Sequence, residues 1–449
     1  MVNQEWVEPS QKHILQPESD VIVCGGGPSG VAAAVAAARS GARTRLFELQ
    51  GCLGGVWTAG LLSIVLDARG KQGFQKELIL RLEKAGEAPL NYFYLAGSGK
   101  THDFIYDPEL MKYTLEDMTQ EAGVNIQLHT RVVGSVKENG HLKAVITESK
   151  SGRQVWPAKI FIDSTGDGDL AAHSGCSFEF GRPDNDQTQP MSMVTLLVGL
   201  DPLEVAPFTN GHPSFTSPGH YDHETKLRLA DALRQAGSPP SYSLPVLFHI
   251  RENLFAFCAN HEYQVSGLSA DQISYATLHA RKEVHTQIKA LRRMGGPWKN
   301  VQIAATPSHI GVREGRRING VYKITINDLI EGKHHPDAVC RVNFPVDVHA
   351  TDPSLGTSYG QEGVKSLPYD IPLRALIAKD VQGLILAGRC ISGDFLSHAS
   401  YRVTGNAIQM GQFAGCLAGL AVQNNSLPPD IHFENVNKLV KENFPYENE

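Results

Sequence analysis

Runs of apolar residues alternate with polar turns along this chain, and the first fifty residues show the clearest succession of elements. Residues 21–23 (Val-Ile-Val) form a continuous apolar run, which is typical of a parallel strand buried on both faces. Residues 28–40 are rich in alanine and predict a closely packed helix, which Gly41 ends. Residues 44–47 predict a second strand. A strand, a helix and a strand in this order predict an α/β fold.

The pattern between residues 111 and 148 predicts a helix followed by a hairpin. Residues 111–122 carry apolar side chains at helical spacing. Residues 131–136 and 141–148 are strand-like, and Asn139-Gly140 between them is a strong signal for a tight turn. We therefore expect two paired antiparallel strands here.

The character of the sequence changes near residue 187. Residues 191–199 predict a strand, 224–235 a helix, and 246–261 two strands broken at residues 252–253. Ser269 and Gln272 fit a capping box at the start of a further helix. That helix carries an apolar stripe made of Ile273, Ala276, Ala280, Val284, Ile288 and Leu291. Farther on, a strand at 384–386 and a long helix at 406–423 are expected.

The turn after the first strand has the spacing G-x-G-x-x-G at Gly25, Gly27 and Gly30. The first glycine allows the tight turn, the second lets a diphosphate approach the backbone, and the third lets helix and strand pack closely. The helix N-terminus adds N–H groups and the positive end of the helix dipole. Glu48 follows the second strand, where a carboxylate can accept hydrogen bonds from ribose. These features predict a dinucleotide site.

Three further segments favour FAD over a nicotinamide cofactor. They read GCLGGVWTAG at 51–60, KIFIDSTGDGDL at 159–170 and GLILAGRCISGD at 383–394. With these motifs the sequence resembles the FAD-dependent oxidoreductase family, within the glutathione-reductase-like FAD-binding superfamily. The resemblance runs from about residue 18 to 423 and includes GVREGRRINGVY and the long motif that begins AGRCISGD.

The resemblance implies how FAD is held. The first motif binds the diphosphate, Glu48 binds the adenosine ribose, backbone near Val132 and Val133 holds adenine, and Asp394 binds ribitol or diphosphate. The N-terminus of the final helix is expected to face the flavin edge that gains negative charge on reduction. The expected cofactor-binding residues are Gly25, Gly27, Pro28, Ser29, Gly30, Glu48, Leu49, Gly54, Gly55, Thr58, Val132, Val133, Thr165, Gly166, Asp167, Gly388, Asp394, Thr404, Gly405 and Asn406.

A disulfide reductase with its own nicotinamide domain is disfavoured. A second complete G-x-G-x-x-G fingerprint is absent, and Cys52 is followed five positions later by Trp57 instead of a second cysteine. The predicted architecture is a glutathione-reductase-like FAD-binding Rossmann domain over 18–186 and 368–425, with an inserted α+β substrate domain over 187–367. Residues 1–17 are an N-terminal arm and residues 426–449 a C-terminal tail.

Composition and charge limit the kinds of partner that this protein is expected to bind. The net charge of −6 argues against nucleic acid, and no apolar run reaches membrane-spanning length. Seven cysteines lack metal-ligand spacing, which favours reduced thiols and a cytoplasmic location. His334-His335 has no companion ligands, so no metal is expected. The arm is expected to pack on the surface or at a subunit contact of a homo-oligomer.

Two basic segments supply the candidate catalytic residues. In SHASYRVTG, His398 is a candidate general base, Arg402 a ligand for a substrate carboxylate or the flavin carbonyl, and Tyr401 a further candidate. In SHIGVREGRRI, Arg313 is expected to orient an anionic substrate, while the alternative is that these arginines face solvent or pair with Glu314.

These features predict an FAD-dependent oxidoreductase, a dehydrogenase or oxidase, that oxidises a small polar organic substrate by hydride transfer to flavin. A CH–OH donor is favoured by His398, and CH–CH and CH–NH donors stay open. The electron acceptor is left open among oxygen, a quinone and a carrier. Two alternatives remain: an FAD-dependent monooxygenase or halogenase, and a non-catalytic flavoprotein subunit.

Overall fold

The computed structural model describes residues 12, 13, 15–88, 90–93, 103–210 and 223–445. A mixed seven-stranded sheet runs in the order β6-β2-β1-β9-β8-β7, and β20 pairs with β9. Its inner strands are parallel, whereas β8 and β7 join antiparallel. The strands are β1 (Ser19–Cys24), β2 (Thr44–Phe47), β6 (Asn125–Gln127), β7 (Arg131–Glu138), β8 (His141–Ser149), β9 (Gly152–Asp163) and β20 (Leu384–Leu386). The α/β prediction is confirmed.

The N-terminal strand, helix and strand are confirmed at their predicted places. Every residue of β1 is buried, and β1 pairs in parallel with β2 on one side and with β9 on the other. Helix α1 (Pro28–Arg39) connects β1 to β2. The predicted hairpin is also present, because Asn139 and Gly140 both have positive φ between β7 and β8.

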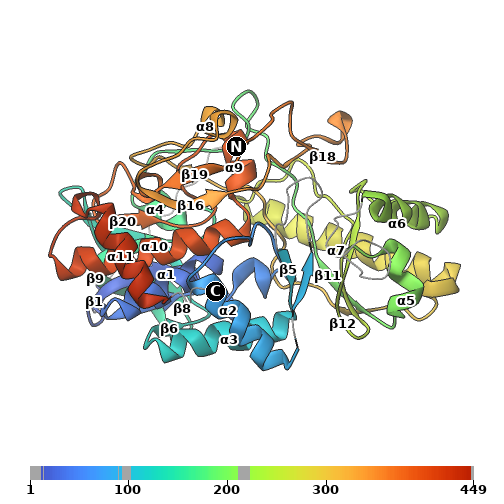
Figure 1. Cartoon of the computed structure of the whole chain (residues 1–449), viewed down its shortest axis with the longest axis horizontal. Helices are drawn as coiled ribbons and strands as arrows, with labels where there is room; N and C mark the ends of the chain where they lie inside the picture. The colour runs from blue at the N-terminus through green and yellow to red at the C-terminus, as the bar shows by residue number, and fades with distance from the viewer. Residues whose placement is uncertain (1–11, 14, 89, 94–102, 211–222, 446–449) are drawn as a thin grey trace.

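Helix α10 (Thr404–Gln423) packs directly against α1, as Figure 1 shows on the left of the molecule. Three glycines of α10, at positions 411, 415 and 419, face α1. A Cβ added to Gly411 would lie 2.1 Å from the Ser29 oxygen, and one added to Gly415 would lie 2.2 Å from the Ala33 oxygen. The alanines of α1 and the glycines of α10 therefore allow the two backbones to approach closely.

The turn between β1 and α1 is equally tight. Gly25 has a φ of 98°, a conformation that side-chain-bearing residues rarely adopt. A Cβ added to Gly30 would lie 1.8 Å from the Gly25 oxygen. The first glycine thus makes the turn and the third lets α1 return against it, as the spacing predicts.

A second, four-stranded antiparallel sheet has the order β12-β13-β11-β14. Its strands are β11 (Thr195–Val198), β12 (Val246–Arg251), β13 (Leu254–Cys258) and β14 (Gln302–Ala305), and α6 (His223–Gln235) and α7 (Ala270–Met294) pack with it on the right of Figure 1. The strand expected at 191–199 is shorter, because Met191 and Ser192 instead form isolated bridges with Glu262 and Gly311.

The predicted capping box of α7 is only half formed. The Ser269 hydroxyl accepts a hydrogen bond from the Gln272 backbone N–H at 3.4 Å. The Gln272 side chain, however, accepts from the Ser266 backbone N–H at 2.6 Å instead of returning to Ser269. The predicted apolar stripe is buried from Ala276 to Leu291.

Residues 318–348 pack into the core around the seven-stranded sheet. Ile318, Val342 and Val348 belong to the same apolar cluster as β1 and α10. Strand β15 (Arg317–Ile318) pairs with β10 (Phe178–Glu179), β16 (Ala338–Val342) with β19 (Tyr369–Pro372), and β17 (Val348–His349) with β18 (Tyr359–Gly360). The expected domain limits at 187 and 367 stay a prediction, although this stretch shares the core of the first sheet.

The remaining segments cover the first sheet. Helices α2 (Phe74–Gly86) and α3 (Pro108–Glu121) contact each other, and α3 fits the helix expected near 111–122. The expected C-terminal tail includes helix α11 (Phe433–Asn443), whose Val436 and Val440 are buried. The expected arm falls largely on residues 1–11 and 14, which lie outside the described residues.

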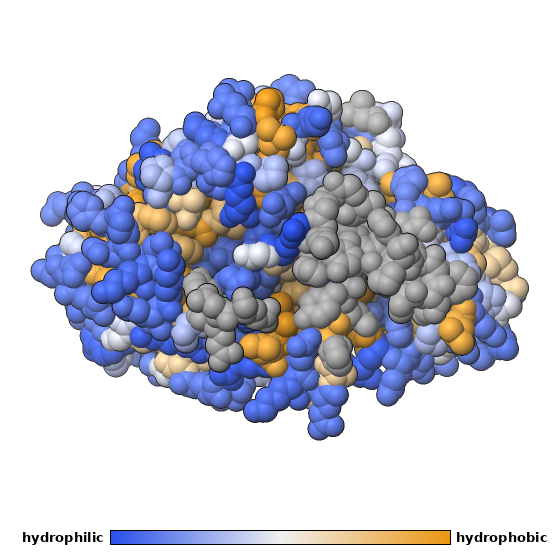
Figure 2. All heavy atoms as spheres, in the orientation of Figure 1, coloured by the Kyte–Doolittle hydropathy of each residue, from blue (hydrophilic) through white to orange (hydrophobic). Residues whose placement is uncertain are grey.

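Hydrophilic residues cover most of the described surface in Figure 2, and hydrophobic residues form small groups there. Among the described residues, every helix is too short or too polar to span a bilayer.

Replacing Gly30 by alanine tests the turn. We expect Gly30→Ala to lower the free energy of unfolding by about 1–3 kcal/mol, because the added methyl group overlaps a backbone oxygen. Thermal and urea unfolding measure this. Gly134→Ala in β7 is the control, since its Cβ meets the Ile146 side chain at an ordinary 3.4 Å. Equal stability of the two variants would contradict the packing described here.

Candidate functional site

A cavity of about 970 Å³ lies between the seven-stranded sheet and the four-stranded sheet. One end is lined by the β1–α1 turn and the end of β2. The other end is lined by β12, β13, the segment just before β11 and residues 344–349. Both sheets therefore contribute to one site, which is large enough for a dinucleotide and a small substrate.

Gly27, Pro28 and Ser29 line the first end of the cavity. A Cβ added to Gly27 would meet nothing within 4 Å, so the backbone here faces open space. Gly27 caps α1 without a side-chain hydrogen bond, and the first turn of α1 carries no acidic residue. The positive end of this twelve-residue helix is thus left for an anion, which is the environment a diphosphate requires.

Glu48 is buried beside this turn and lines the cavity. Its Oε2 accepts from the Gly26 N–H at 2.6 Å and its Oε1 from the Gln50 N–H at 2.7 Å. Burial raises the pKa of Glu48, while these two N–H groups lower it. Each carboxylate oxygen keeps a further lone pair, so Glu48 can still accept from ribose hydroxyls. Leu49 and Val132 line the cavity next to it.

A second polar turn follows β9 at residues 164–167. Thr165, Gly166 and Asp167 line the cavity, and Gly388 meets them from the end of β20. The Arg389 Nη2 atom lies 2.6 Å from Asp167 Oδ1. Arg389 lines the cavity but was missed by the sequence reasoning, although it follows Gly388 in the quoted AGRC motif.

Several expected cofactor residues stand behind the cavity wall. The cavity lining does not include Gly30, Gly54, Thr58, Val133, Asp394, Gly405 or Asn406. The Thr58 hydroxyl donates to the Leu53 oxygen at 2.6 Å. Asp394 accepts from the Ser397 N–H and the Ile326 N–H, both at 2.7 Å. Asp394 therefore fixes the start of α9 (Phe395–Tyr401) and a neighbouring loop, and its expected contact with ribitol or diphosphate stays a prediction.

The final helix meets the cavity at one expected residue, Thr404. The Gly405 N–H donates to the Leu66 oxygen at 3.1 Å, so it is already occupied. Asn406 is fully buried, and its Oδ1 lies 3.3 Å from the Cys340 thiol. Gly55, from the second glycine-rich motif, also lines the cavity.

The four expected catalytic residues divide into two pairs. Arg313 and Arg402 line the cavity, whereas His398 and Tyr401 do not. His398 is fully buried, and burial together with nearby arginines holds the pKa of its ring well below the ordinary value. The Tyr401 hydroxyl donates to the Ile391 oxygen at 3.0 Å. His398 and Tyr401 therefore lie outside the cavity lining, and their catalytic roles stay predictions.

A different histidine lines the cavity, and it lies beside a carboxylate. His349 Nε2 is 3.3 Å from Asp347 Oδ2, and Arg402 Nη2 is 3.2 Å from the same oxygen. Sequence reasoning missed this pair. The sequence pattern that could have indicated it is Asp347-Val348-His349. Alternate residues of an extended segment point to the same side, so the carboxylate and the imidazole are expected to lie next to each other.

Electrostatics at this end are set by burial and by arginines. Burial raises the pKa of Asp347, but His349, Arg402 and Arg313 outweigh it and hold that pKa far below its usual range. Burial and Arg313 lower the pKa of His349 to about 3, against the pull of Asp347. His349 is therefore a neutral imidazole at pH 7, and burial lowers the pKa of Arg402 to about 10, so Arg402 stays charged.

The walls around this pair are aromatic and aliphatic. Tyr242, Phe248 and Tyr359 line the cavity together with the aliphatic side chains of Val194 and Val246. This part of the cavity thus combines fixed cations, one carboxylate and an imidazole with apolar surfaces, a composition suited to a small organic anion.

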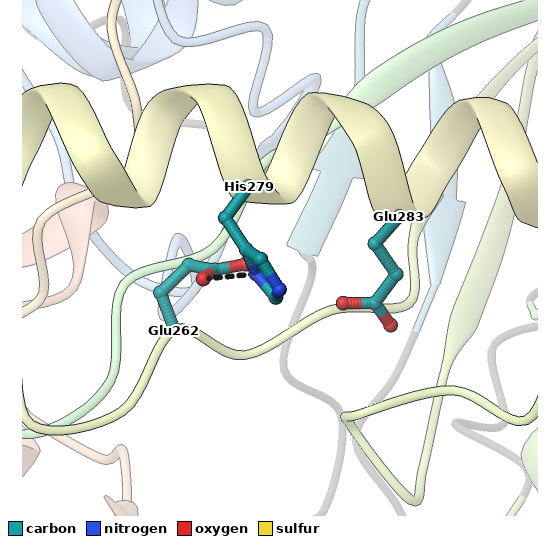
Figure 3. A group of neighbouring side chains, drawn as sticks. All are labelled: Glu262, His279 and Glu283. Atoms are coloured by element: carbon teal, nitrogen blue, oxygen red, sulfur yellow. Dashed lines mark hydrogen bonds and ion pairs between the residues drawn. The ribbon is translucent and has the colours of Figure 1, made fainter.

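Outside the cavity, Glu262, His279 and Glu283 form the group among the described residues that has metal-ligand geometry, shown in Figure 3. The protein itself already occupies these atoms. His279 Nδ1 lies 2.8 Å from a Glu262 oxygen, and Glu283 accepts from the backbone and hydroxyl of Ser241 and from Gln287. These hydrogen bonds account for the cluster as a link between α7 and the preceding loops, and the expectation that no metal is bound stays a prediction.

Comparison with known proteins identifies the cofactor. The family model for FAD-dependent oxidoreductases matches residues 20–440. The chain belongs to this family. Its cofactor is FAD, and the first end of the cavity fits this group through the open space at Gly27, the uncapped end of α1 and the Glu48 carboxylate. No curated protein matches the chain.

Solved structures resemble the chain at low sequence identity. A triple mutant of the flavin-dependent brominase Bmp2 is 11% identical, with 95% of this chain and 84% of that chain covered and a TM-score of 0.50. A geranylgeranyl bacteriochlorophyll reductase-like protein from Thermoplasma acidophilum is 16% identical, with 95% and 84% covered and a TM-score of 0.46. The p-nitrophenol 4-monooxygenase PnpA from Pseudomonas putida is 11% identical, with 95% and 85% covered and a TM-score of 0.48.

Replacing Gly27 by alanine tests the diphosphate position. We expect Gly27→Ala to leave the free energy of unfolding of the apoprotein within about 0.5 kcal/mol, because the methyl group enters open space. We expect FAD affinity to fall at least about tenfold, or about 1.4 kcal/mol, since that space receives the diphosphate. Fluorescence titration of the apoprotein with FAD measures this, with Gly134→Ala as control. Unchanged FAD affinity would place the diphosphate elsewhere.

Proposed function

We propose that this protein oxidises a small organic anion by hydride transfer to FAD. The observation that carries the proposal is that Arg313 and Arg402 line the same cavity as the Asp347–His349 pair, with Arg402 ion-paired to Asp347. Oxidation of an alcohol or amine carbon removes a hydride and a proton. FAD, when bound, accepts the hydride, and the remaining tasks fall to the side chains of this chain.

Arg313 is held rigidly for binding an anion. Its Nη1 donates to the Pro190 oxygen at 2.6 Å and to the Ser192 hydroxyl at 2.8 Å. These bonds fix the guanidinium plane, and its other N–H groups remain for a carboxylate, which a guanidinium binds in a bidentate manner.

Arg402 supplies the second cation. Its Nη2 donates to the Asp347 backbone oxygen at 2.9 Å and approaches the Asp347 carboxylate. Its Nε is buried and has no hydrogen-bond partner among the described residues. A buried N–H of a charged group is costly to leave unpaired, so a bound ligand that accepts from it gains that energy. We assign Arg402 to the substrate anion or to the flavin carbonyl.

We assign proton removal to the Asp347–His349 pair, in which the Asp347 carboxylate takes the proton in the cavity and passes it to His349 Nε2, 3.3 Å away. A neutral imidazole has one basic nitrogen, and a neighbouring carboxylate stabilises the imidazolium that forms on proton uptake. His349 belongs to β17 and Asp347 directly precedes it, so the short pairing of β17 with β18 holds the two side chains in place.

Three finer features belong to the same proposal. We propose that the cofactor-binding half is of the glutathione-reductase-like Rossmann type, supported by β1-α1-β2 and its glycines. We propose that the four-stranded sheet belongs to an inserted substrate domain, supported by its separate apolar core. We also propose a cytoplasmic location, supported by seven cysteines that are all unpaired.

A monooxygenase or halogenase is the second candidate. In its favour are the apolar and aromatic walls around Tyr242, Phe248 and Tyr359, which suit an aromatic substrate, and a fold shared with the brominase. Such an enzyme needs flavin that is reduced before substrate chemistry begins. A non-catalytic flavoprotein subunit is the third candidate function.

A donor panel separates the three candidates. Under anaerobic conditions we expect hydroxy acids or amino acids to bleach the bound flavin faster than neutral alcohols, because the two arginines favour anionic donors. Absorbance of the oxidised flavin band measures this. Bleaching by NADPH alone would favour the monooxygenase. Failure of every donor would favour the non-catalytic protein.

Two histidine variants test the assignment of the base. We expect His349→Gln to slow flavin reduction by the best donor at least about 100-fold with FAD content unchanged, because general-base catalysis is lost. We expect His398→Asn, where FAD is retained, to reduce flavin at the wild-type rate, since His398 does not reach the cavity. Stopped-flow absorbance measures both rates. The opposite ranking would return the role of base to His398.

A further inference from the structure

Four side chains form an unbroken line of polar contacts that begins at the cavity wall. Asp347 Oδ2 lies 3.3 Å from His349 Nε2, His349 Nδ1 lies 3.1 Å from His261 Nε2, and His261 Nδ1 lies 3.0 Å from the Tyr263 hydroxyl. Asp347 and His349 line the cavity, but His261 and Tyr263 do not. His261 is almost fully buried, whereas Tyr263 is only half-buried. The line therefore runs from the cavity to a half-buried tyrosine.

The surrounding residues hold the His261 ring in position. Tyr242 stacks on that ring with centroids 4.1 Å apart. The His261 backbone N–H donates to the Ser241 hydroxyl at 2.9 Å. Ser241 and Tyr242 both belong to the loop before β12, so this one loop holds His261 in place, and Tyr242 also lines the cavity.

Both rings are neutral, as a relay requires. Burial, and after it Arg313 and the other histidine, lower the pKa of the His261 ring, and burial and Arg313 act in the same way on His349. Arg402 adds to this on the cavity side, and Asp347 opposes it. A neutral imidazole has one N–H and one lone pair, so each ring can accept a proton on one nitrogen while giving one from the other.

We propose that Asp347, His349, His261 and Tyr263 relay a proton between the cavity and the surface. The proposal rests on the proposed function, in which the Asp347–His349 pair receives a proton from the substrate. The substrate proton passes through the Asp347 carboxylate to His349 Nε2, the His349 Nδ1–H bond breaks as His261 Nε2 gains that proton, the His261 Nδ1 proton passes to the Tyr263 oxygen, and the Tyr263 hydroxyl proton leaves to water. One proton moves outward and no electrons move.

At the outer end of the line, the Tyr263 hydroxyl has two possible hydrogen-bond acceptors, one for each arrangement of protons. The Tyr263 hydroxyl can donate to His261 Nδ1 at 3.0 Å or to the Ser241 backbone oxygen at 3.3 Å. The first arrangement follows outward transfer, and the second leaves the Tyr263 oxygen free to accept from His261. Beside it, the Ser241 hydroxyl donates to Glu283, which lies next to exposed His279 on α7 in Figure 3.

The decisive variant is Tyr263→Phe in the holoenzyme, which removes only the terminal hydroxyl. We expect flavin reduction by the best donor to slow at least about tenfold with KM and FAD content unchanged. We also expect added imidazole buffer to restore part of the rate, because a small base can take the proton from His261 at this half-buried position. Tyr275→Phe is the matched control, since Tyr275 is exposed and stacks on His279 outside the line. A wild-type rate, or a loss that buffer does not relieve, would overturn the relay.

A second measurement needs no donor and separates this proposal from the proposed function. Nitrogen-15 NMR of histidine-labelled holoenzyme reports which ring nitrogen carries the proton, with signals assigned by His261→Gln and His349→Gln. We expect Tyr263→Phe to shift the nitrogens of both His261 and His349, although Tyr263 touches only the first. If His349 does not respond, the line is not coupled and the relay is wrong. If no donor reduces the wild-type flavin, the proposed function fails and the NMR result alone decides the relay.

Discussion

Close backbone packing around α1 is the constraint on which the rest of this structure depends. On one side Gly30 lets the helix lie against the turn at Gly25, and on the other the glycines of α10 let a second helix lie against its alanines. With side chains at these positions the helices would have to separate by the width of a methyl group or more. The N-terminus of α1 would then no longer face the cavity at Gly27, where a diphosphate needs it.

This packing also brings the two ends of the chain together. Helix α10 begins near residues 402–404, which line the cavity, and then runs along α1. The N-terminal fingerprint and the C-terminal motif are therefore placed relative to each other by one helix pair. Cofactor residues and Arg402 share a cavity although nearly 400 positions separate them in sequence, because α1 and α10 are locked together.

The cavity is electrostatically divided. At the α1 end, backbone N–H groups and a helix dipole favour a dianionic diphosphate without a neighbouring lysine or arginine in the first turn. At the far end, Arg313 and Arg402 surround one carboxylate and a neutral histidine. Burial makes each of these interactions stronger than it would be in water, and it also forces the polar groups there into hydrogen-bonded lines such as the one from Asp347 to Tyr263.

Local pattern by itself determined the elements and the cofactor of this protein. Apolar runs predicted β1 and β2, and the Asn139-Gly140 turn predicted the hairpin, because each of these depends on neighbours within a few residues. The glycine motifs predicted FAD. Only the tertiary structure decided which polar side chains reach the cavity. His398 and Asp394 sit in a motif beside the site but turn into the core, where Asp394 caps α9. His349, His261 and Tyr263 come from separate segments, and their alignment depends on how two sheets and the intervening loops pack, which sequence spacing does not encode.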